Sequence, residues 1–161
     1  WGMDGEANVF LEEVFQWLSE NLPSNQNPKK LCWGDSRIGN VLFEDFKVKS
    51  LLDWEMATIG DPLCDLAWGL TTDDVSSHGL NIEKLSGSIS NQEAIKFWEN
   101  NTGFSADNFF YYRILCLFKF SVIMIRVAKK LIHNEIMPLD SDFHINNHVS
   151  NYLRQEFNEK N

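Results

Sequence analysis

The first part of the chain predicts one helix followed by a loop. Between Val9 and Leu22, apolar residues recur with helical spacing and polar residues fill the positions between them. This pattern is typical of an amphipathic helix that buries one stripe. Residues 23–30 are mostly Pro, Ser, Asn and Lys, a composition that interrupts the periodicity and predicts a loop.

Short apolar runs indicate β-structure after this loop. The runs occupy residues 31–33, 41–43 and 48–52. A polar turn at residues 44–47 separates the last two runs. Because short apolar runs bounded by turn residues are typical of strands, we expect two small strands that pair as a hairpin.

A helix is expected to begin at Asp61 and Pro62. Aspartate accepts hydrogen bonds at a helix N-cap, and proline lacks an N–H group that the first helical position does not need. The apolar pattern carries this helix to about Leu70. Residues 71–88 are mostly Ser, Asp, Gly and Asn, and they predict a loop.

The C-terminal half predicts three further helices. Ser90 and Glu93 form a capping-box pattern, which marks a helix N-terminus. A long apolar helix is expected to follow, with Asp107 as its N-cap and Pro138 beyond its end. Residues 143–157 are amphipathic again. The chain is therefore predicted to be an α+β protein that is predominantly helical.

Composition and charge narrow the class of protein. A length of 161 residues with 43% hydrophobic content allows one ordinary domain. The formal net charge of −9 opposes binding to nucleic-acid phosphates and to anionic lipid. The three cysteines form no CxxC pair, which favours a reducing compartment. We therefore expect a cytoplasmic protein with no nucleic-acid partner and no membrane partner.

Three oxygen-bearing side chains are expected to converge near the strands. Asp35 and Asn40 share one loop with Gly34 and Gly39, which allow the backbone to fold tightly. Asp53 follows the return strand of the predicted hairpin, which can bring it alongside Asn40. Carboxylate and amide oxygens suit Mg²⁺, which takes its remaining ligands from water and substrate phosphates. A second aspartate near such a metal can accept the proton of an attacking hydroxyl.

Two stretches of the chain carry a family resemblance. Residues 31–40 read L-C-W-G-D-S-R-I-G-N, and residues 51–67 read L-L-D-W-E-M-A-T-I-G-D-P-L-C-D-L-A. Together they resemble the aminoglycoside phosphotransferase (APH) family, whose catalytic loop H-G-D-x-x-x-x-N precedes a metal-binding Asp and G-D-P-x-x-D-L-A. The resemblance covers residues 31–70. It implies the C-terminal lobe of a protein-kinase-like fold, in which a small β-hairpin carries the catalytic loop.

The resemblance implies a role for each residue of the motifs. Asp35 corresponds to the catalytic base that orients the acceptor hydroxyl. Asn40 and Asp53 correspond to the residues that hold Mg²⁺ and, through it, the phosphates of ATP. Arg37 lies where related kinases often carry a Lys directed at the transferred phosphate. Asp61 and Asp65 resemble structural aspartates: the first caps a helix and braces the catalytic loop, and the second is a further brace.

The activity implied by the resemblance is a kinase reaction. An ATP- and Mg²⁺-dependent phosphotransferase of this kind, EC 2.7.1-like, moves the γ-phosphoryl group to a hydroxyl of a small molecule. Family members phosphorylate antibiotics, choline-like alcohols, and amino-acid or sugar hydroxyls, and some relatives with this motif style are joined to acyl-CoA dehydrogenases. The phosphate acceptor therefore stays open.

The chain departs from the family pattern in two ways. Trp33 occupies the position of the family His, and an indole donates a hydrogen bond but accepts none, so we expect a structural substitution. A Gly-rich loop and a V-A-I-K-like strand do not occur, and the chain begins with Trp1. Residues 1–161 are therefore expected to be one partial domain, a fragment whose N-terminal lobe is supplied in cis and which is inactive alone. The alternative is a non-catalytic kinase-like domain that binds a ligand or partner, and a third possibility is a Mg²⁺-dependent phosphohydrolase.

Other polar clusters have simpler explanations. His144 and His148 have the helical spacing of a metal-binding pair, but no third ligand is evident. Asp73 and Asp74 would suit a cationic substrate, and a solvated loop explains them equally well. Trp54 and Trp68 could pack around the site or line it, and packing in the core is the favoured interpretation.

Overall fold

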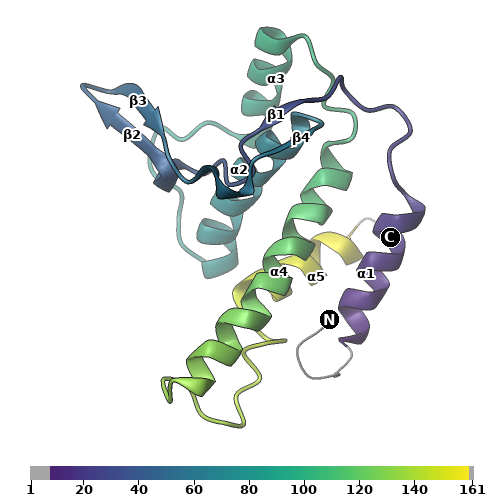
Figure 1. The fold of residues 1–161 in the computed structure, drawn as a ribbon, viewed down its shortest axis with the longest axis vertical. Coiled ribbons are helices and arrows are strands. Elements are labelled where there is room, and N and C mark those ends of the chain that lie inside the picture. Colours follow the sequence, from purple (N-terminus) through teal and green to yellow (C-terminus); the bar gives the residue numbers. More distant parts are fainter. Residues whose placement is uncertain (1–7, 160–161) are drawn as a thin grey trace. The chain divides into compact units, whose positions relative to one another are not determined.

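The computed structural model describes residues 8–159 of the chain. The chain divides into two compact units. The first unit takes in residues 1–22 and 114–161, and the second takes in residues 23–113. The two motifs that carry the family resemblance lie in the second unit, and the His144 and His148 pair lies in the first. Figure 1 shows the elements of both units.

The first unit is helical. It contains α1 (Val9–Glu20), most of α4 (Phe109–His133) and α5 (His148–Asn158). The Asn8 side chain caps α1 by accepting a hydrogen bond from the Leu11 amide at 3.1 Å. The predicted N-terminal helix is thereby confirmed, and its apolar stripe is buried at Leu11, Val14 and Leu18.

The end of α4 agrees with the prediction, whereas the start of α5 does not. α4 ends at His133, before Pro138 as expected. α5 begins later than residue 143, because Asn147 acts as its N-cap and accepts hydrogen bonds from the Val149 and Ser150 amides at 3.1 Å. A cap that satisfies two amide groups fixes a helix start more firmly than an amphipathic pattern does.

The predicted hairpin is confirmed. β2 (Val41–Glu44) and β3 (Lys47–Leu51) pair antiparallel, with Val41 opposite Leu51. Asp45 and Phe46 connect them at φ values of 50° and 58°. Two consecutive residues in the left-handed region make the turn whose twist matches that of paired strands.

A second ribbon was not expected from the sequence. β1 (Lys30–Cys32) pairs antiparallel with β4 (Thr58–Gly60). A three-residue strand with one strongly apolar side chain gives almost no periodic signal, and only its partner across the sheet defines it. The two ribbons bracket the segment that carries the polar motifs (Figure 1).

Helix α2 (Leu63–Ser77) is longer than predicted. The expectation of a loop over residues 71–88 is wrong at its start, because the helix continues to Ser77. Tertiary packing explains the extension, because Thr71, Asp74 and Val75 are buried. Packing of this kind overrides the low helix propensity of Thr, Asp and Ser.

Helix α3 (Asn91–Thr102) begins where the capping box predicted it. The Ser90 hydroxyl accepts from the Glu93 amide at 3.3 Å, and the Glu93 carboxylate accepts from the Ser90 amide at 2.8 Å. Gly103 ends the helix at a φ of 72°, a conformation that glycine adopts without strain.

Asp74 anchors the second half of α2. Its carboxylate accepts hydrogen bonds from Lys84, Arg113 and Asn91, each at 2.7 Å, and only 2% of the side chain is exposed. Burial acts to raise the pKa of Asp74, but the three donors and the charge of Arg113 outweigh it, so the pKa lies below its usual value. Since Lys84 also pairs with Asp73 at 2.7 Å, the two acids do not form an open site for a cationic substrate.

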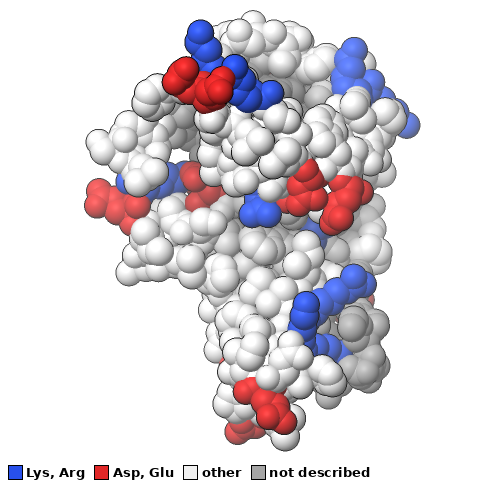
Figure 2. Space-filling view, turned by 60° about the vertical axis from the view of Figure 1, so that its left-hand side comes forward, with Lys and Arg blue, Asp and Glu red and all other residues white. Residues whose placement is uncertain are grey.

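Two further properties of the described residues concern membrane spanning and surface charge (Figure 2). No helix among them is long and apolar enough to cross a bilayer. On that face, acidic and basic side chains are interspersed and separated by uncharged surface.

We expect Asp74→Ala to destabilise the protein by about 3–5 kcal/mol, because it removes the buried ion pair between Asp74 and the Arg113 guanidinium. Asp73→Ala is the matched control and should cost about 1 kcal/mol or less, since that carboxylate is 59% exposed. Urea unfolding of both variants measures the difference. Equal losses would contradict the anchoring role of Asp74.

Candidate active site

The loop between β1 and β2 is held on helix α2 by Asp65. Its two carboxylate oxygens accept hydrogen bonds from the Trp33 amide at 2.7 Å and from the Gly34 amide at 2.8 Å. The Ser36 hydroxyl donates to the Asp65 carbonyl at 2.6 Å. Charge-assisted bonds to successive amides fix both the position and the direction of the loop.

Three residues on one face of α2 contact this loop. Asp65, Trp68 and Gly69 have the spacing i, i+3 and i+4, which places them side by side on a helix. A Cβ at Gly69 would lie 2.7 Å from the Ser36 carbonyl oxygen, closer than any real contact. The loop can therefore lie against α2 only because position 69 carries no side chain.

Gly34 meets two demands at once. Its φ of 91° belongs to the region that glycine favours. A Cβ at this position would overlap the Met56 carbonyl oxygen. The backbone thus turns sharply just before Asp35.

The Asp35 carboxylate accepts three hydrogen bonds. Oδ2 accepts from Arg37 Nε at 2.9 Å and from Asn40 Nδ2 at 2.7 Å, and Oδ1 accepts from Trp68 Nε1 at 2.7 Å. Burial acts to raise the pKa of Asp35, but these donors and the Arg37 charge together outweigh it, so the pKa lies below its usual value. The side chain is still 14% exposed, so an ionised carboxylate remains open to solvent.

The structure connects Asp53 to the same loop through its neighbour Leu52. The Leu52 amide donates to the Asn40 carbonyl at 2.8 Å, and the Trp33 indole donates to the Leu52 carbonyl at 2.8 Å. Asp53 itself has a φ of 60° and a ψ of 61°, so the chain leaves the strand direction at this residue. Asp53 is exposed, and its carboxylate forms no hydrogen bond or ion pair within residues 8–159.

Asn40 and Asp53 offer oxygen atoms that fit Mg²⁺. Because Asn40 Nδ2 donates to Asp35, its Oδ1 is the atom left for a metal, and no described residue donates to it. Hard oxygen ligands with room for water and phosphate are what this ion requires. In the described part of the chain, no three His, Cys, Asp or Glu side chains are grouped to hold a metal, so the His144 and His148 pair gains no third ligand.

Arg37 contacts the Asp35 carboxylate. Its Nε is the nitrogen that contacts Asp35, and the side chain is 52% exposed. The sequence pattern placed Arg37 toward a transferred phosphate. The structure places it beside the carboxylate that would act on the acceptor, with Nη1 and Nη2 not bonded to any described residue.

Asp61 has different neighbours from Asp65. Its carboxylate accepts from the Leu63 amide at 2.9 Å, from the Asn27 amide at 3.0 Å and from the Tyr112 hydroxyl at 3.2 Å. Burial, followed by the charge of Asp61, raises the pKa of Tyr112. Asp61 therefore ties residues 23–30 and the first turn of α4 to the start of α2, and the loop-bracing contacts belong to Asp65.

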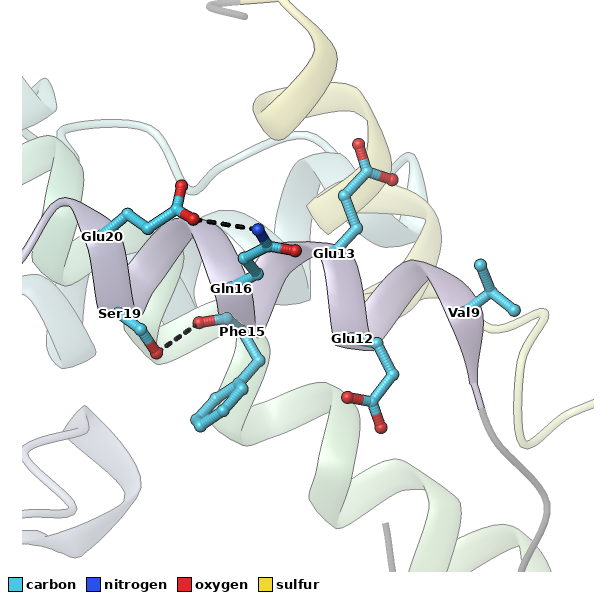
Figure 3. Close-up of a pocket in the computed structure, with 7 residues that line it drawn as sticks. All are labelled: Val9, Glu12, Glu13, Phe15, Gln16, Ser19 and Glu20. Carbon is cyan, nitrogen blue, oxygen red and sulfur yellow. Dashed lines mark hydrogen bonds between the residues drawn. The ribbon is translucent and has the colours of Figure 1, made fainter.

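A hollow along α1 is a weaker candidate site. Figure 3 shows Glu12 and Glu13 pointing away from each other, so they do not share a centre. Glu20 accepts a hydrogen bond from Gln16 at 2.9 Å, within the helix. The lining residues all come from this one helix: Val9, Glu12, Glu13, Phe15, Gln16, Ser19 and Glu20.

A comparison with family models identifies the wider group of proteins. The model of the phosphotransferase enzyme family, APH, matches residues 3–94, which are more than half of the chain. The chain belongs to the phosphotransferase enzyme family. The matched region includes the loop with Asp35 and Asn40 and extends through α2 of this phosphotransferase-family chain.

Curated relatives of this phosphotransferase-family chain are longer proteins. The acyl-CoA dehydrogenase family member 11 of Pongo abelii is 33% identical over 124 residues, which are 70% of this chain and 16% of that protein. The Homo sapiens protein of the same name is 44% identical over 59 residues, which are 35% of this chain and 8% of that protein. The Mus musculus acyl-CoA dehydrogenase family member 10 is 42% identical over 60 residues, which are 36% of this chain and 6% of that protein. The chain thus spans less than a fifth of each relative.

A solved structure has the same fold. A protein of Ralstonia eutropha assigned to the aminoglycoside phosphotransferases aligns with a TM-score of 0.70 and 18% identity, over 95% of this chain and 48% of that one. At this identity the likeness concerns the fold alone. It confirms the predicted α+β, predominantly helical, kinase-like phosphotransferase fold, and the chain spans about half of that protein.

Sequence reasoning assigned Trp68 to the core and missed its hydrogen bond to Asp35. The residue is indeed buried, with 5% of its surface exposed, yet its N–H group reaches the carboxylate. A signal was present in the spacing: Trp68 follows Asp65 by one helical turn, on the face that braces the loop.

Gly69→Ala should destabilise the protein by about 1–3 kcal/mol, because the new methyl group forces the loop away from α2. Gly60→Ala is the control: its Cβ would lie 3.8 Å from Cys32 Sγ, an ordinary contact, and should cost less than about 1 kcal/mol. Thermal unfolding measures both. Equal stability of Gly69→Ala and the wild type would refute the close approach.

The lowered pKa of Asp35 predicts a pH-dependent stability. A carboxyl whose pKa is depressed in the folded state stabilises that state above its unfolded pKa, and the contribution is lost as the pH falls through the folded pKa. The wild type should therefore exceed Asp35→Asn in stability at neutral pH, and the difference should shrink below about pH 4. Urea titrations from pH 7 to pH 3 measure it, with Asp107→Asn, a change at an exposed acid, as the control.

Proposed function

We propose that this chain provides the catalytic loop of an ATP- and Mg²⁺-dependent phosphotransferase that acts on a hydroxyl of a small molecule. The observation that supports it is the Asp35 carboxylate, held by three donors, kept ionised and still open to solvent. A base must combine a fixed position with an accessible acceptor atom, and this residue has both.

In the proposed reaction, Asp35 accepts the proton of the acceptor hydroxyl. The oxygen lone pair forms a bond to the γ-phosphorus of ATP, and the bond between that phosphorus and the β–γ bridging oxygen breaks. Its electron pair leaves with ADP, and the proton passes from Asp35 to solvent. Positioning and electrostatics are expected to supply most of the rate in this class of reaction.

Asn40 and Asp53 would hold Mg²⁺ in this proposal. When bound, the ion would neutralise charge on the nucleotide phosphates. Arg37 is an exposed cation of the site, and its guanidinium carries two further nitrogen atoms besides the one that contacts Asp35. Those nitrogens would offset the charge that develops on the transferred group.

The non-catalytic alternative lacks a comparable observation. Trp33 and the lack of a Gly-rich loop in residues 1–161 were the sequence features that favoured it. The Trp33 indole donates a hydrogen bond to the Leu52 carbonyl, which ties the loop to the residue before Asp53. A phosphohydrolase would use the same acids. It would differ from a kinase because it needs no nucleotide.

Asp35→Asn and Asp53→Asn should each lower turnover about a hundredfold or more, because one removes the base and the other a metal ligand. The assay follows ADP release by the full-length protein with MgATP and a panel of alcohols, since this chain covers 48% of its structural neighbour. Asp107→Asn is the matched control at an exposed acid of the same unit and should retain wild-type turnover.

Each failure of this experiment has a distinct meaning. Wild-type turnover by both Asp35→Asn and Asp53→Asn would refute the proposed mechanism. Phosphate release from a phosphoester without any nucleotide would favour the hydrolase. Absence of ADP release with every alcohol, together with retained binding of MgATP, would favour the non-catalytic domain.

A further inference from the structure

The two oxygens of the Asp35 carboxylate are not equivalent. Oδ2 accepts two hydrogen bonds, from Arg37 Nε and Asn40 Nδ2. Oδ1 accepts one, from Trp68 Nε1 at 2.7 Å. A carboxylate oxygen has about two acceptor positions, so Oδ2 is filled and Oδ1 keeps one open.

We propose that Trp68 is a positioning residue which orients the Asp35 carboxylate so that Oδ1 receives the proton of the acceptor hydroxyl. This inference rests on the function proposed above and adds the atom at which the proton is taken. The Trp68 indole directs one acceptor position of Oδ1 toward α2 and leaves the other for the substrate.

The chemistry of the indole suits this task. Its N–H group donates and has no acceptor capacity, so it cannot take the proton in place of Asp35. It is uncharged, so it aligns the carboxylate without neutralising it. An amide or a hydroxyl at position 68 would bring an acceptor of its own beside the substrate hydroxyl.

The placement of Trp68 is more rigid than that of Arg37. The indole is 5% exposed on α2, between Asp65 and the close contact of Gly69 with Ser36. The Arg37 side chain is 52% exposed. Trp68 and Asn40 donate to one carboxylate oxygen each, so the orientation of the carboxylate does not depend on Arg37 alone.

The first experiment measures kcat and the KM for MgATP of the full-length protein with the best alcohol of the panel. Trp68→Phe keeps an aromatic ring and removes the N–H group. We expect kcat to fall about tenfold or more, with the KM for MgATP changed less than about twofold. Trp98→Phe, the same change in α3, should leave both unaltered.

A double-mutant comparison separates positioning from packing. If Trp68 acts through Asp35, Trp68→Phe should cost no further activity in the Asp35→Asn background. A loss that is the same in both backgrounds would show that Trp68 acts through packing alone, and it would overturn the proposal.

A spectroscopic measurement that needs no catalytic activity tests the proposal even if Trp68→Phe folds poorly. Protein labelled with 5-fluorotryptophan gives a resonance for each tryptophan, and Trp68→Phe identifies the one that disappears. That resonance should shift in Asp35→Asn, whereas the Trp98 resonance should not. An unshifted Trp68 resonance would overturn the proposal.

The outcomes distinguish this inference from the function on which it rests. Wild-type activity in Asp35→Asn refutes the mechanism itself. An inactive Asp35→Asn together with a Trp68→Phe variant that matches the wild type in kcat refutes only the role of Trp68. Loss of kcat with little change in KM, non-additivity with Asp35→Asn and a shifted Trp68 resonance together support it.

Discussion

The contact of one face of α2 with the loop between β1 and β2 determines the site. Asp65 binds two successive backbone amides of this loop, and Gly69 lets the two segments approach within contact distance. Trp68, between them on the helix, reaches Asp35. If this face were displaced, Asp35 would lose its orientation even with every residue of its motif present. Helix α2 therefore positions the loop, and the loop carries Asp35.

Much of this arrangement could be predicted, for physical reasons that differ between residues. Periodicity identified α1 and α4, and Ser90 with Glu93 marked the start of α3, because both signals are local in the sequence. The end of α2 could not be predicted, because the contacts that stabilise it are not local. Asp74, in the last part of the helix, bonds to Lys84 and to Arg113, which lie beyond the helix in the sequence. β4 could not be predicted for the same reason, because its partner strand defines it. The spacing of Asp35 and Asn40 predicted that they lie close together, whereas Trp68, which donates to Asp35 Oδ1, comes from α2.

Two aspartates with lowered pKa values show why electrostatics alone does not identify a site. Asp35 and Asp74 each accept three hydrogen bonds, and each includes an arginine among its partners. The Asp74 side chain is 2% exposed and its cations are enclosed with it, so it stabilises the fold. Asp35 is 14% exposed and retains an acceptor position. Accessibility, together with unused hydrogen-bond capacity, distinguishes the carboxylate that we propose as the base from the structural one.

Trp33 shows how a substitution at a motif position can be silent in hydrogen-bond terms. Its backbone amide binds Asp65, and its ring N–H binds the carbonyl of Leu52. That carbonyl needs only a donor, which an indole provides although it accepts no hydrogen bond. A search pattern that requires histidine at this position would therefore miss this chain and any relative that carries tryptophan there.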